Sequence, residues 1–202
     1  MIVVGLVGGV ASGKSSVALD FRKLGACILD GDRIGHEVLG LTEVKDRLIE
    51  RWGDVILTDD GQIDRRKVAA IVFGDAADAQ TNLNFLESIT HPKIKQRLVD
   101  RLEQLRQSAR FPLVVLDAAV MFKSGWDSLC SKIIFVDAPR ELRIKRAQLR
   151  GLSVEQFEAR EKAQMSTEKK KKRSDIVIDN SGRPQTTFNQ VEEVWQSLLQ
   201  IA

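Results

Sequence analysis

A phosphate-binding loop is predicted near the N-terminus by residue types and spacing, in the segment Gly8-Gly9-Val10-Ala11-Ser12-Gly13-Lys14-Ser15, which matches G-x-x-x-x-G-K-[ST]. Glycines at Gly8 and Gly13 permit backbone angles that a side chain would forbid, so bare N–H groups can turn toward phosphate oxygens at a helix N-terminus. Lys14 would neutralise nucleotide β and γ oxygens, and Ser15 would ligate Mg²⁺. The residues predicted to bind the nucleotide, ATP in our prediction, are Gly8, Ala11, Ser12, Gly13, Lys14, Ser15 and Ser16. The motif alone does not distinguish a kinase from a GTPase or an ATPase, but the sequence has no Asn-Lys-x-Asp segment for guanine recognition, which counts against a GTPase.

Two aspartates follow the second apolar run, which ends Ile28-Leu29-Asp30-Gly31-Asp32. On an extended chain, carboxylates two residues apart point to the same side. Here that side would lie at the sheet edge where open α/β proteins bind ligands. Asp32 would then orient an attacking hydroxyl group and accept its proton. The alternative, that Asp32 only caps the following helix, stays open.

Other charged side chains would complete a nucleotide site. Asp117 ends another apolar run. Proteins with this type of phosphate loop place the carboxylate that holds Mg²⁺ at such a strand end. The alternative is that Asp117 only caps the end of the strand. Arg143, Arg146 and Arg150 are spaced to share one helix face, and guanidinium groups suit triphosphate oxygens. The alternative, a solvated helix face, stays open from the spacing alone.

Five short apolar runs without polar alternation predict strands that are buried on both faces. They are Ile2–Leu6, Cys27–Leu29, Leu113–Leu116, Ile133–Val136 and Ile176–Ile178. Helical patterns separate them, which predicts a parallel α/β sheet with right-handed crossovers. The predicted core comprises 1–32, 111–138 and 174–202, with a helical acceptor-binding region at 33–110 and a lid at 139–173. Within the lid, Pro139 is expected in the first turn of a helix, and Ser153 with Gln156 predicts a capping box.

Composition excludes several classes of protein. With 31 basic and 28 acidic residues, the net charge of +3 is too balanced to indicate a nucleic-acid binder. The run Lys169–Arg173 is the exception; we expect it to be solvated with occasional phosphate contact, since no aromatic residues interleave it. Cys27 and Cys130 are too far apart in sequence to suggest a zinc site or a disulfide framework. No apolar stretch approaches the ~20 residues of a membrane span, so a cytoplasmic protein is expected.

The chain resembles the dephospho-CoA kinases, a P-loop kinase family, from residue 3 to about 182. The segments that carry the resemblance are the phosphate loop, Leu29–Ile34, Asp64-Arg65-Arg66 leading to Phe73, His91-Pro92, Gln164-Met165 and Asp175–Asn180. The resemblance implies the P-loop kinase fold and transfer of the ATP γ-phosphoryl group to the ribose 3′-hydroxyl of dephospho-CoA, with Asp32 as general base. It also implies that Arg65, Arg66 and His91 lie on the acceptor side, that Asn180 lies near the adenine, and that Arg146 or Arg150, in the lid position, acts on phosphate. The alternatives are a surface arginine for Arg66 and a turn or packing histidine for His91.

Two helix starts are expected next to these acceptor-side residues. Asp64 is expected at the start of a helix, and His91, which precedes Pro92, is expected to be extended just before another helix.

The sequence departs from this family at several positions. Lys123 stands where an acidic residue is usual, and His36 where arginine is common. Ala11 and Ser16 replace a glycine and a threonine, which are milder changes. A kinase acting on a nucleoside or nucleotide therefore stays open as an alternative. A noncatalytic nucleotide- or RNA-binding protein is the least favoured interpretation, and a monomer or weak homo-oligomer without a specific nucleic-acid partner is expected.

Overall fold

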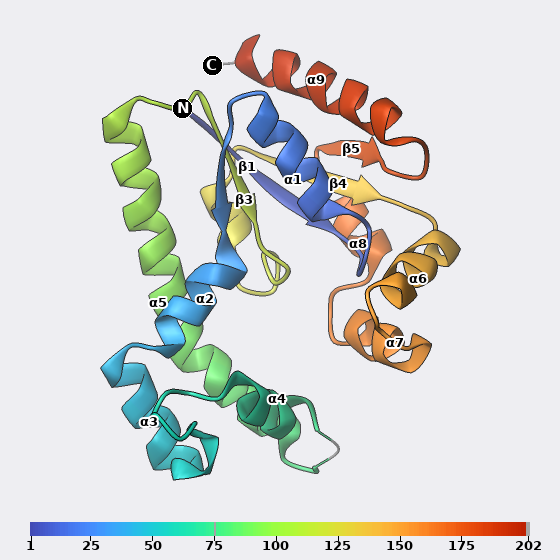
Figure 1. The fold of residues 1–202 in the computed structure, drawn as a ribbon. Coiled ribbons are helices and arrows are strands. Elements are labelled where there is room, and N and C mark those ends of the chain that lie inside the picture. The colour runs from blue at the N-terminus through green and yellow to red at the C-terminus, as the bar shows by residue number, and fades with distance from the viewer. Residues whose placement is uncertain (75, 201–202) are drawn as a thin grey trace. The chain divides into compact units, whose positions relative to one another are not determined.

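The computed structural model describes residues 1–74 and 76–200 and contains a five-stranded sheet (Figure 1). The strands are β1 (Ile2–Gly8), β2 (Cys27–Asp30), β3 (Leu113–Asp117), β4 (Lys132–Asp137) and β5 (Ile176–Asp179). All neighbours are parallel, in the order β2-β3-β1-β4-β5. The predicted fold class is confirmed, and each predicted apolar run lies within one strand.

The chain divides into two compact units, one formed by residues 1–31 with the chain from Arg101 onward, and one formed by Asp32–Asp100. The helices of the first unit are α1 (Lys14–Lys23), η2 (Trp126–Leu129), α6 (Arg140–Leu149), α7 (Val154–Lys162), α8 (Thr167–Lys172) and α9 (Pro184–Gln200). Those of the second unit are α3 (Thr42–Trp52), η1 (Asp54–Ile56) and α4 (Arg65–Phe73). The connecting helices α2 (Gly31–Leu39) and α5 (Ala79–Ser108) each continue across the division.

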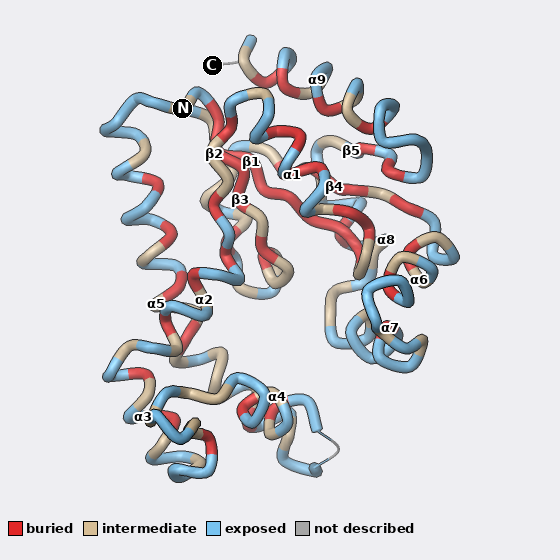
Figure 2. The backbone as a smooth tube through the Cα atoms, viewed as in Figure 1, coloured by how far each residue is buried: buried red, intermediate tan, exposed pale blue. Residues whose placement is uncertain are grey.

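The core of the first unit forms between the sheet and two helices, α1 and α9. Val4 and Leu6 of β1 are fully buried and pack in one cluster with Phe21 of α1 and Trp195 of α9. Figure 2 shows that β1 and β3, which lie inside the sheet, are buried along most of their length. Because parallel strands end at the same sheet edge, this packing brings the ends of β1, β2 and β3 together.

The second unit, taken by itself, is helical, and polar and aromatic contacts join α3 to α5. Trp52 Nε1 of α3 donates a hydrogen bond to Asn82 Oδ1 of α5 at 3.2 Å, and the Trp52 ring meets Phe85 edge-on at 5.8 Å. Asp64 caps α4, because its carboxylate accepts a hydrogen bond from the Arg66 N–H at 2.8 Å. The helix start predicted at Asp64 is confirmed.

Two local expectations about proline are wrong. Pro92 was expected to follow an extended residue and open a helix, whereas it lies inside α5, and His91 is helical. Proline in a helix removes one backbone hydrogen bond, but buried Ile94 and Leu98 on the same helix supply packing that keeps it continuous. Pro139 is the N-cap of α6 and precedes its first turn.

The predicted capping box of the lid is present. Ser153 Oγ accepts from the Gln156 N–H at 3.2 Å, and the Ser153 N–H donates to Gln156 Oε1 at 3.0 Å. This reciprocal pair begins α7 where the sequence predicted it. None of the described helices is both long enough and apolar enough to cross a lipid bilayer.

Candidate active site

The phosphate loop connects the end of β1 at Gly8 to the start of α1 at Lys14. Gly13 is the N-cap of α1, and it offers no side chain to accept from the free N–H groups of the first turn. No acidic residue lies in that turn either. Since the N-terminus of a helix carries a partial positive charge, this arrangement leaves the start of α1 able to bind an external anion.

Two residues of the loop have left-handed backbone angles. Gly13 has φ of +97° and Ala11 has φ of +56°. Glycine adopts this region without strain, whereas alanine costs about 1–2 kcal/mol there. Ala11, which the sequence marked as a mild replacement of glycine, therefore occupies a position that favours glycine.

Replacing Gly13 with alanine is expected to damage nucleotide binding as well as stability. A Cβ atom at Gly13 would lie 2.0 Å from Asn180 Nδ2, a buried amide that is itself hydrogen-bonded. Gly125 is the matched control, because its φ is +68° and its added Cβ would meet nothing within 4 Å. Gly125→Ala should cost about 1–2 kcal/mol of unfolding free energy and leave ATP affinity unchanged. Gly13→Ala should cost more and weaken ATP binding by calorimetry; equal effects of the two variants would contradict this.

Lys14 and Asp117 meet at the sheet edge. Lys14 Nζ lies 3.6 Å from Asp117 Oδ1, and each side chain is one-fifth exposed. Asp117 ends β3, in register with Leu6 of β1 on one side and Asp30 of β2 on the other. The fold thus brings the loop lysine and a strand-end carboxylate, which are more than a hundred residues apart in sequence, to one solvent-accessible position.

Three alternate carbonyl groups of the loop, those of Gly8, Val10 and Ser12, are held by side chains from outside it. The donors are Lys170 to Gly8 (3.0 Å), Arg143 to Val10 (3.4 Å), and both Arg146 (3.2 Å) and Asn180 (2.8 Å) to Ser12. A trans peptide unit is planar, so the N–H group that follows each held carbonyl points to the opposite side. The loop amides are therefore oriented before any ligand arrives.

Arg143, which the sequence groups with Arg146 and Arg150 on one helix face, is buried. Its Nε donates to the Ala138 carbonyl at 3.1 Å, its guanidinium pairs with Glu161, and it lies over the Phe157 ring at 5.5 Å from the ring centroid. It therefore ties the loop to both α6 and α7. The alternative of a solvated helix face is therefore wrong for Arg143.

Arg146 and Arg150 both line a cavity of about 280 Å³ at the end of α6. Arg146 Nη2 also donates to the Asn180 carbonyl at 2.8 Å, and Asn180 Oδ1 accepts from Thr187 Oγ1 at 3.1 Å. The same cavity is lined by Gly13, Ser16 and Leu149, of which Leu149 is 88% exposed. The structure thus groups Ser16, Arg146, Arg150 and Asn180, all predicted site residues, around one opening beside the loop.

Lys170 differs from its neighbours in the basic run. It is only 4% exposed, and its ammonium donates to the Gly8 carbonyl and, at 2.7 Å, to Gln164 Oε1. Lys171 instead pairs with Asp137 on the surface at 2.6 Å, as the prediction of a solvated run requires. That prediction is wrong for Lys170, because the side of α8 that faces β1 must fill the space behind the loop.

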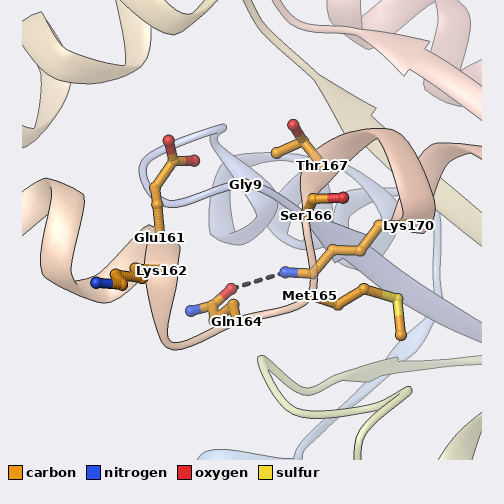
Figure 3. A pocket seen from close by; sticks show the side chains of 8 residues that line it. All are labelled: Gly9, Glu161, Lys162, Gln164, Met165, Ser166, Thr167 and Lys170. Carbon is orange, nitrogen blue, oxygen red and sulfur yellow. Dashed lines mark hydrogen bonds between the residues drawn. The ribbon is translucent and has the colours of Figure 1, made fainter.

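A second cavity, of about 270 Å³, opens between the phosphate loop and the segment that connects α7 to α8 (Figure 3). Gly9 forms one side, and Gln164, Thr167 and Lys170 lie on the others, with the Gln164 and Lys170 side chains pointing toward each other.

Ser12 Oγ is buried and finds no hydrogen-bond partner in the described part of the chain.

Asp30 and Asp32 do not share one extended segment as expected. Asp30 is the last residue of β2, and the chain turns into α2 at Gly31. Asp32 is therefore an exposed residue in the first turn of a helix, where the helix dipole also favours a carboxylate. An added Cβ at Gly31 would lie 2.9 Å from that of Ala118, so the close packing of this turn against the start of the β3–β4 connection requires glycine.

The residues predicted for the acceptor side lie on helices of the second unit. Arg65 Nη1 is 2.8 Å from His36 Nδ1. This contact links the start of α4 to the end of α2. Arg66 follows it in the first turn of α4 and is exposed. His91 lies within α5 and is partly buried. His36, noted as a departure in the sequence, is thus a direct neighbour of Arg65.

Sequence reasoning missed the contribution of Arg143 and Lys170 to the loop. A signal existed for the second: Gln164, its hydrogen-bond partner, belongs to one of the segments that carried the family resemblance. A run of four lysines on one helix also cannot have all members on the same face. Which lysine turns inward depends on how α8 docks, and that is set by residues far away in sequence.

Comparison with known proteins identifies relatives along nearly the whole chain. The sequence pattern of the dephospho-CoA kinase family matches residues 2–185. The chain is 39% identical to the dephospho-CoA kinase of Carboxydothermus hydrogenoformans over 196 residues, 96% of this chain and 93% of that protein. Among solved structures, a Thermus thermophilus protein is similar at 32% identity with a TM-score of 0.81, covering 98% of this chain and 97% of that one. The dephospho-CoA kinase of Campylobacter jejuni is similar at 25% identity with a TM-score of 0.73 and the same coverage.

Proposed function

This chain belongs to the dephospho-CoA kinase family, and from that premise we propose which of its residues carry out the reaction. The chain phosphorylates dephospho-CoA with ATP, and the products are coenzyme A and ADP. The acceptor atom is the ribose 3′-hydroxyl oxygen, which attacks the γ-phosphorus in line with the leaving ADP. Little covalent chemistry is left for the protein, so catalysis rests on positioning and on stabilising negative charge.

One observation carries the assignment of the ATP site: an oriented loop of backbone amides precedes a helix start at which Lys14 and Asp117 meet. We assign Lys14 to the β and γ oxygens of ATP. The amides of Gly8–Ser15, the buried hydroxyl of Ser12 and the exposed start of α1 provide the remaining phosphate contacts. Ser16, in the first turn of α1, lies next to these groups.

The donor set at this position fits Mg²⁺. We assign the Ser15 hydroxyl and the Asp117 carboxylate as its protein ligands, because Mg²⁺ prefers oxygen donors and is held through one or two protein groups plus phosphates. When bound, Mg²⁺ neutralises phosphate charge during the transfer.

The acceptor hydroxyl is assigned to Asp32, which would orient it and receive its proton. The assignment is supported by the family resemblance and by the place of Asp32 directly after β2, on a first helical turn and exposed to solvent. Arg65, Arg66 and His91 are assigned to the acceptor, whose phosphates suit guanidinium groups. The contact between His36 and Arg65 would restrain the Arg65 side chain.

The adenosine end of ATP is assigned to the cavity of about 280 Å³ beside the loop. Asn180 and Arg146 line it and already hold the loop from that side. Arg150, at the end of α6, is exposed and free to move toward phosphate when the lid closes. We therefore assign Arg146 and Arg150 to the charge of the transferring group, with Arg146 also positioning the loop.

Acceptor preference gives a direct test of this function. In a coupled assay of ADP release, dephospho-CoA should stimulate ATP consumption by this chain far more than nucleosides or nucleoside monophosphates do. Lys123 and His36, which depart from the family pattern, are the reason to include the other acceptors. Preference for a nucleoside or nucleotide would replace the substrate assignment and leave the ATP site standing. Steep salt-dependent RNA binding without acceptor-dependent turnover would overturn the kinase assignment itself.

We also propose that this protein works in the cytoplasm, where ATP is supplied, and that it is a monomer or weak homo-oligomer. We propose no specific nucleic-acid partner for it. Two members of the basic run support this, because Lys171 and Arg173 are paired with Asp137 and Asp127 at 2.6 and 2.9 Å.

A further inference from the structure

Lys170 occupies an unusual position for a lysine of the lid. Its side chain crosses behind the phosphate loop and its ammonium ends on the carbonyl of Gly8, the last residue of β1. Gln164 Oε1 accepts a second hydrogen bond at 2.7 Å, from the connection between α7 and α8 (Figure 3). An ammonium buried to this degree is rare among lysines and costs free energy unless nearby groups compensate it.

The charges around Lys170 do not compensate it in the absence of ligand. Burial, assisted by the Lys14 and Arg143 cations, lowers the pKa of Lys170 to about 8, although the Glu161 carboxylate acts in the opposite direction. Glu161 is also committed to Arg143 by an ion pair. One further cation, Lys162, lines the same cavity as Lys170, and the Lys14 cation is paired with the Asp117 carboxylate. The site behind the loop therefore holds more positive than negative groups.

We propose that Lys170 is a positioning residue for ATP, one that holds the Gly8 carbonyl and supplies a second ammonium, besides Lys14, to balance the ATP phosphates. Through the Gly8 carbonyl it directs the following amide, that of Gly9, to the other side of the peptide plane. Gly9 and Lys170 line the same cavity, so Lys170 acts on the loop at the residue that borders this opening. The inference rests on the proposed assignment of ATP to the Gly8–Ser15 loop.

This arrangement links ATP binding to proton uptake. Phosphate anions brought to the loop favour the charged form of a nearby ammonium, so the pKa of Lys170 rises from about 8 when ATP binds. At pH values well below the pKa of Lys170 in the free protein, Lys170 is protonated with and without ATP, and no proton is exchanged. Above it, the ATP complex binds more protons than the free protein, so affinity falls as pH rises. For a pKa restored to the ordinary lysine value, the loss in affinity from pH 7.5 to 8.5 is about threefold.

The test is calorimetry of ATP binding to the whole chain with Mg²⁺ and without acceptor, in two buffers of different ionisation enthalpy. The wild-type protein should take up about three-quarters of a proton per ATP at pH 8.5 and close to none at pH 7.0. Lys170→Arg keeps a donor and a charge but does not titrate, so it should bind ATP with the uptake and the pH dependence lost. Lys170→Met should lose roughly 10-fold or more in ATP affinity at pH 7.0. Lys172→Met, from the exposed part of the same run, should behave as wild type.

The outcomes separate the two proposals. If the wild-type protein does not bind ATP, the assignment of the loop falls, and the inference with it. If ATP binds but uptake at pH 8.5 is absent, or persists in Lys170→Arg, the charge of Lys170 is not part of binding and the inference alone is overturned. Should Lys170→Met fail to fold, as circular dichroism would reveal, the comparison of wild type with Lys170→Arg still decides.

Discussion

Lys14→Ala is expected to lower kcat for dephospho-CoA phosphorylation by at least about 10²–10³-fold while leaving the protein folded. The charge of Lys14 stands at the start of α1, beside Asp117, where the γ-phosphoryl group is assigned. Negative charge is redistributed there during transfer, so a fixed ammonium stabilises the transition state more than the bound substrate. The measurement is steady-state ADP release with saturating dephospho-CoA, supported by thermal unfolding of both proteins.

A matched control separates this effect from a general loss of positive charge. Lys145 lies on α6 between Arg143 and Arg146 and is exposed, so Lys145→Ala removes the same charge from the same unit without touching the loop. It should retain turnover within about twofold, as expected of a surface substitution. Lys14→Ala with turnover as high as Lys145→Ala would show that the loop does not bind the transferring phosphoryl group.

Asp32→Asn is expected to lower kcat by about 10²–10⁴-fold, the usual contribution of a general base. The amide keeps the size of the side chain but cannot accept the proton of the attacking hydroxyl group. Because ATP is assigned to other residues, the KM for ATP should change little. The measurement is the separate determination of kcat and of both KM values by coupled assay.

The interpretation of Asp32 as a purely structural residue makes a different prediction. A carboxylate in the first turn of α2 is worth about 0.3–1 kcal/mol through the helix dipole, so its loss would lower the unfolding temperature slightly and leave kcat intact. Asp30→Asn is the companion variant, because Asp30 ends β2 in register with Asp117. If Asp30→Asn loses turnover and Asp32→Asn does not, the general base is assigned to the wrong carboxylate.

Local patterns were sufficient to predict much of this fold. The five strands lie where apolar runs occur, because interior parallel strands must be apolar on both faces. Asp64 and Ser153 begin helices as predicted, because a cap acts through hydrogen bonds within its own turn. Pro92 was misjudged because proline preferences are local too, and the packing of α5 outweighs them.

The amino-acid sequence by itself determined the phosphate loop, since its glycines, lysine and serine act through neighbouring backbone and need no distant partner. It also indicated the kinase family, through several short segments in a fixed order. The roles assigned to Asp32, Asp117, Arg150 and the acceptor-side residues stay predictions.

Only the tertiary structure decided which charges stand behind the loop. Lys170 reaches Gly8 across 162 positions of sequence, and Arg143 reaches Val10 across 133. One lysine of a basic run is buried while its neighbours are solvated, because helix docking selects a single side of α8 to face β1. Burial and pairing of a charge depend on long-range packing, which the composition of the surrounding segment does not predict.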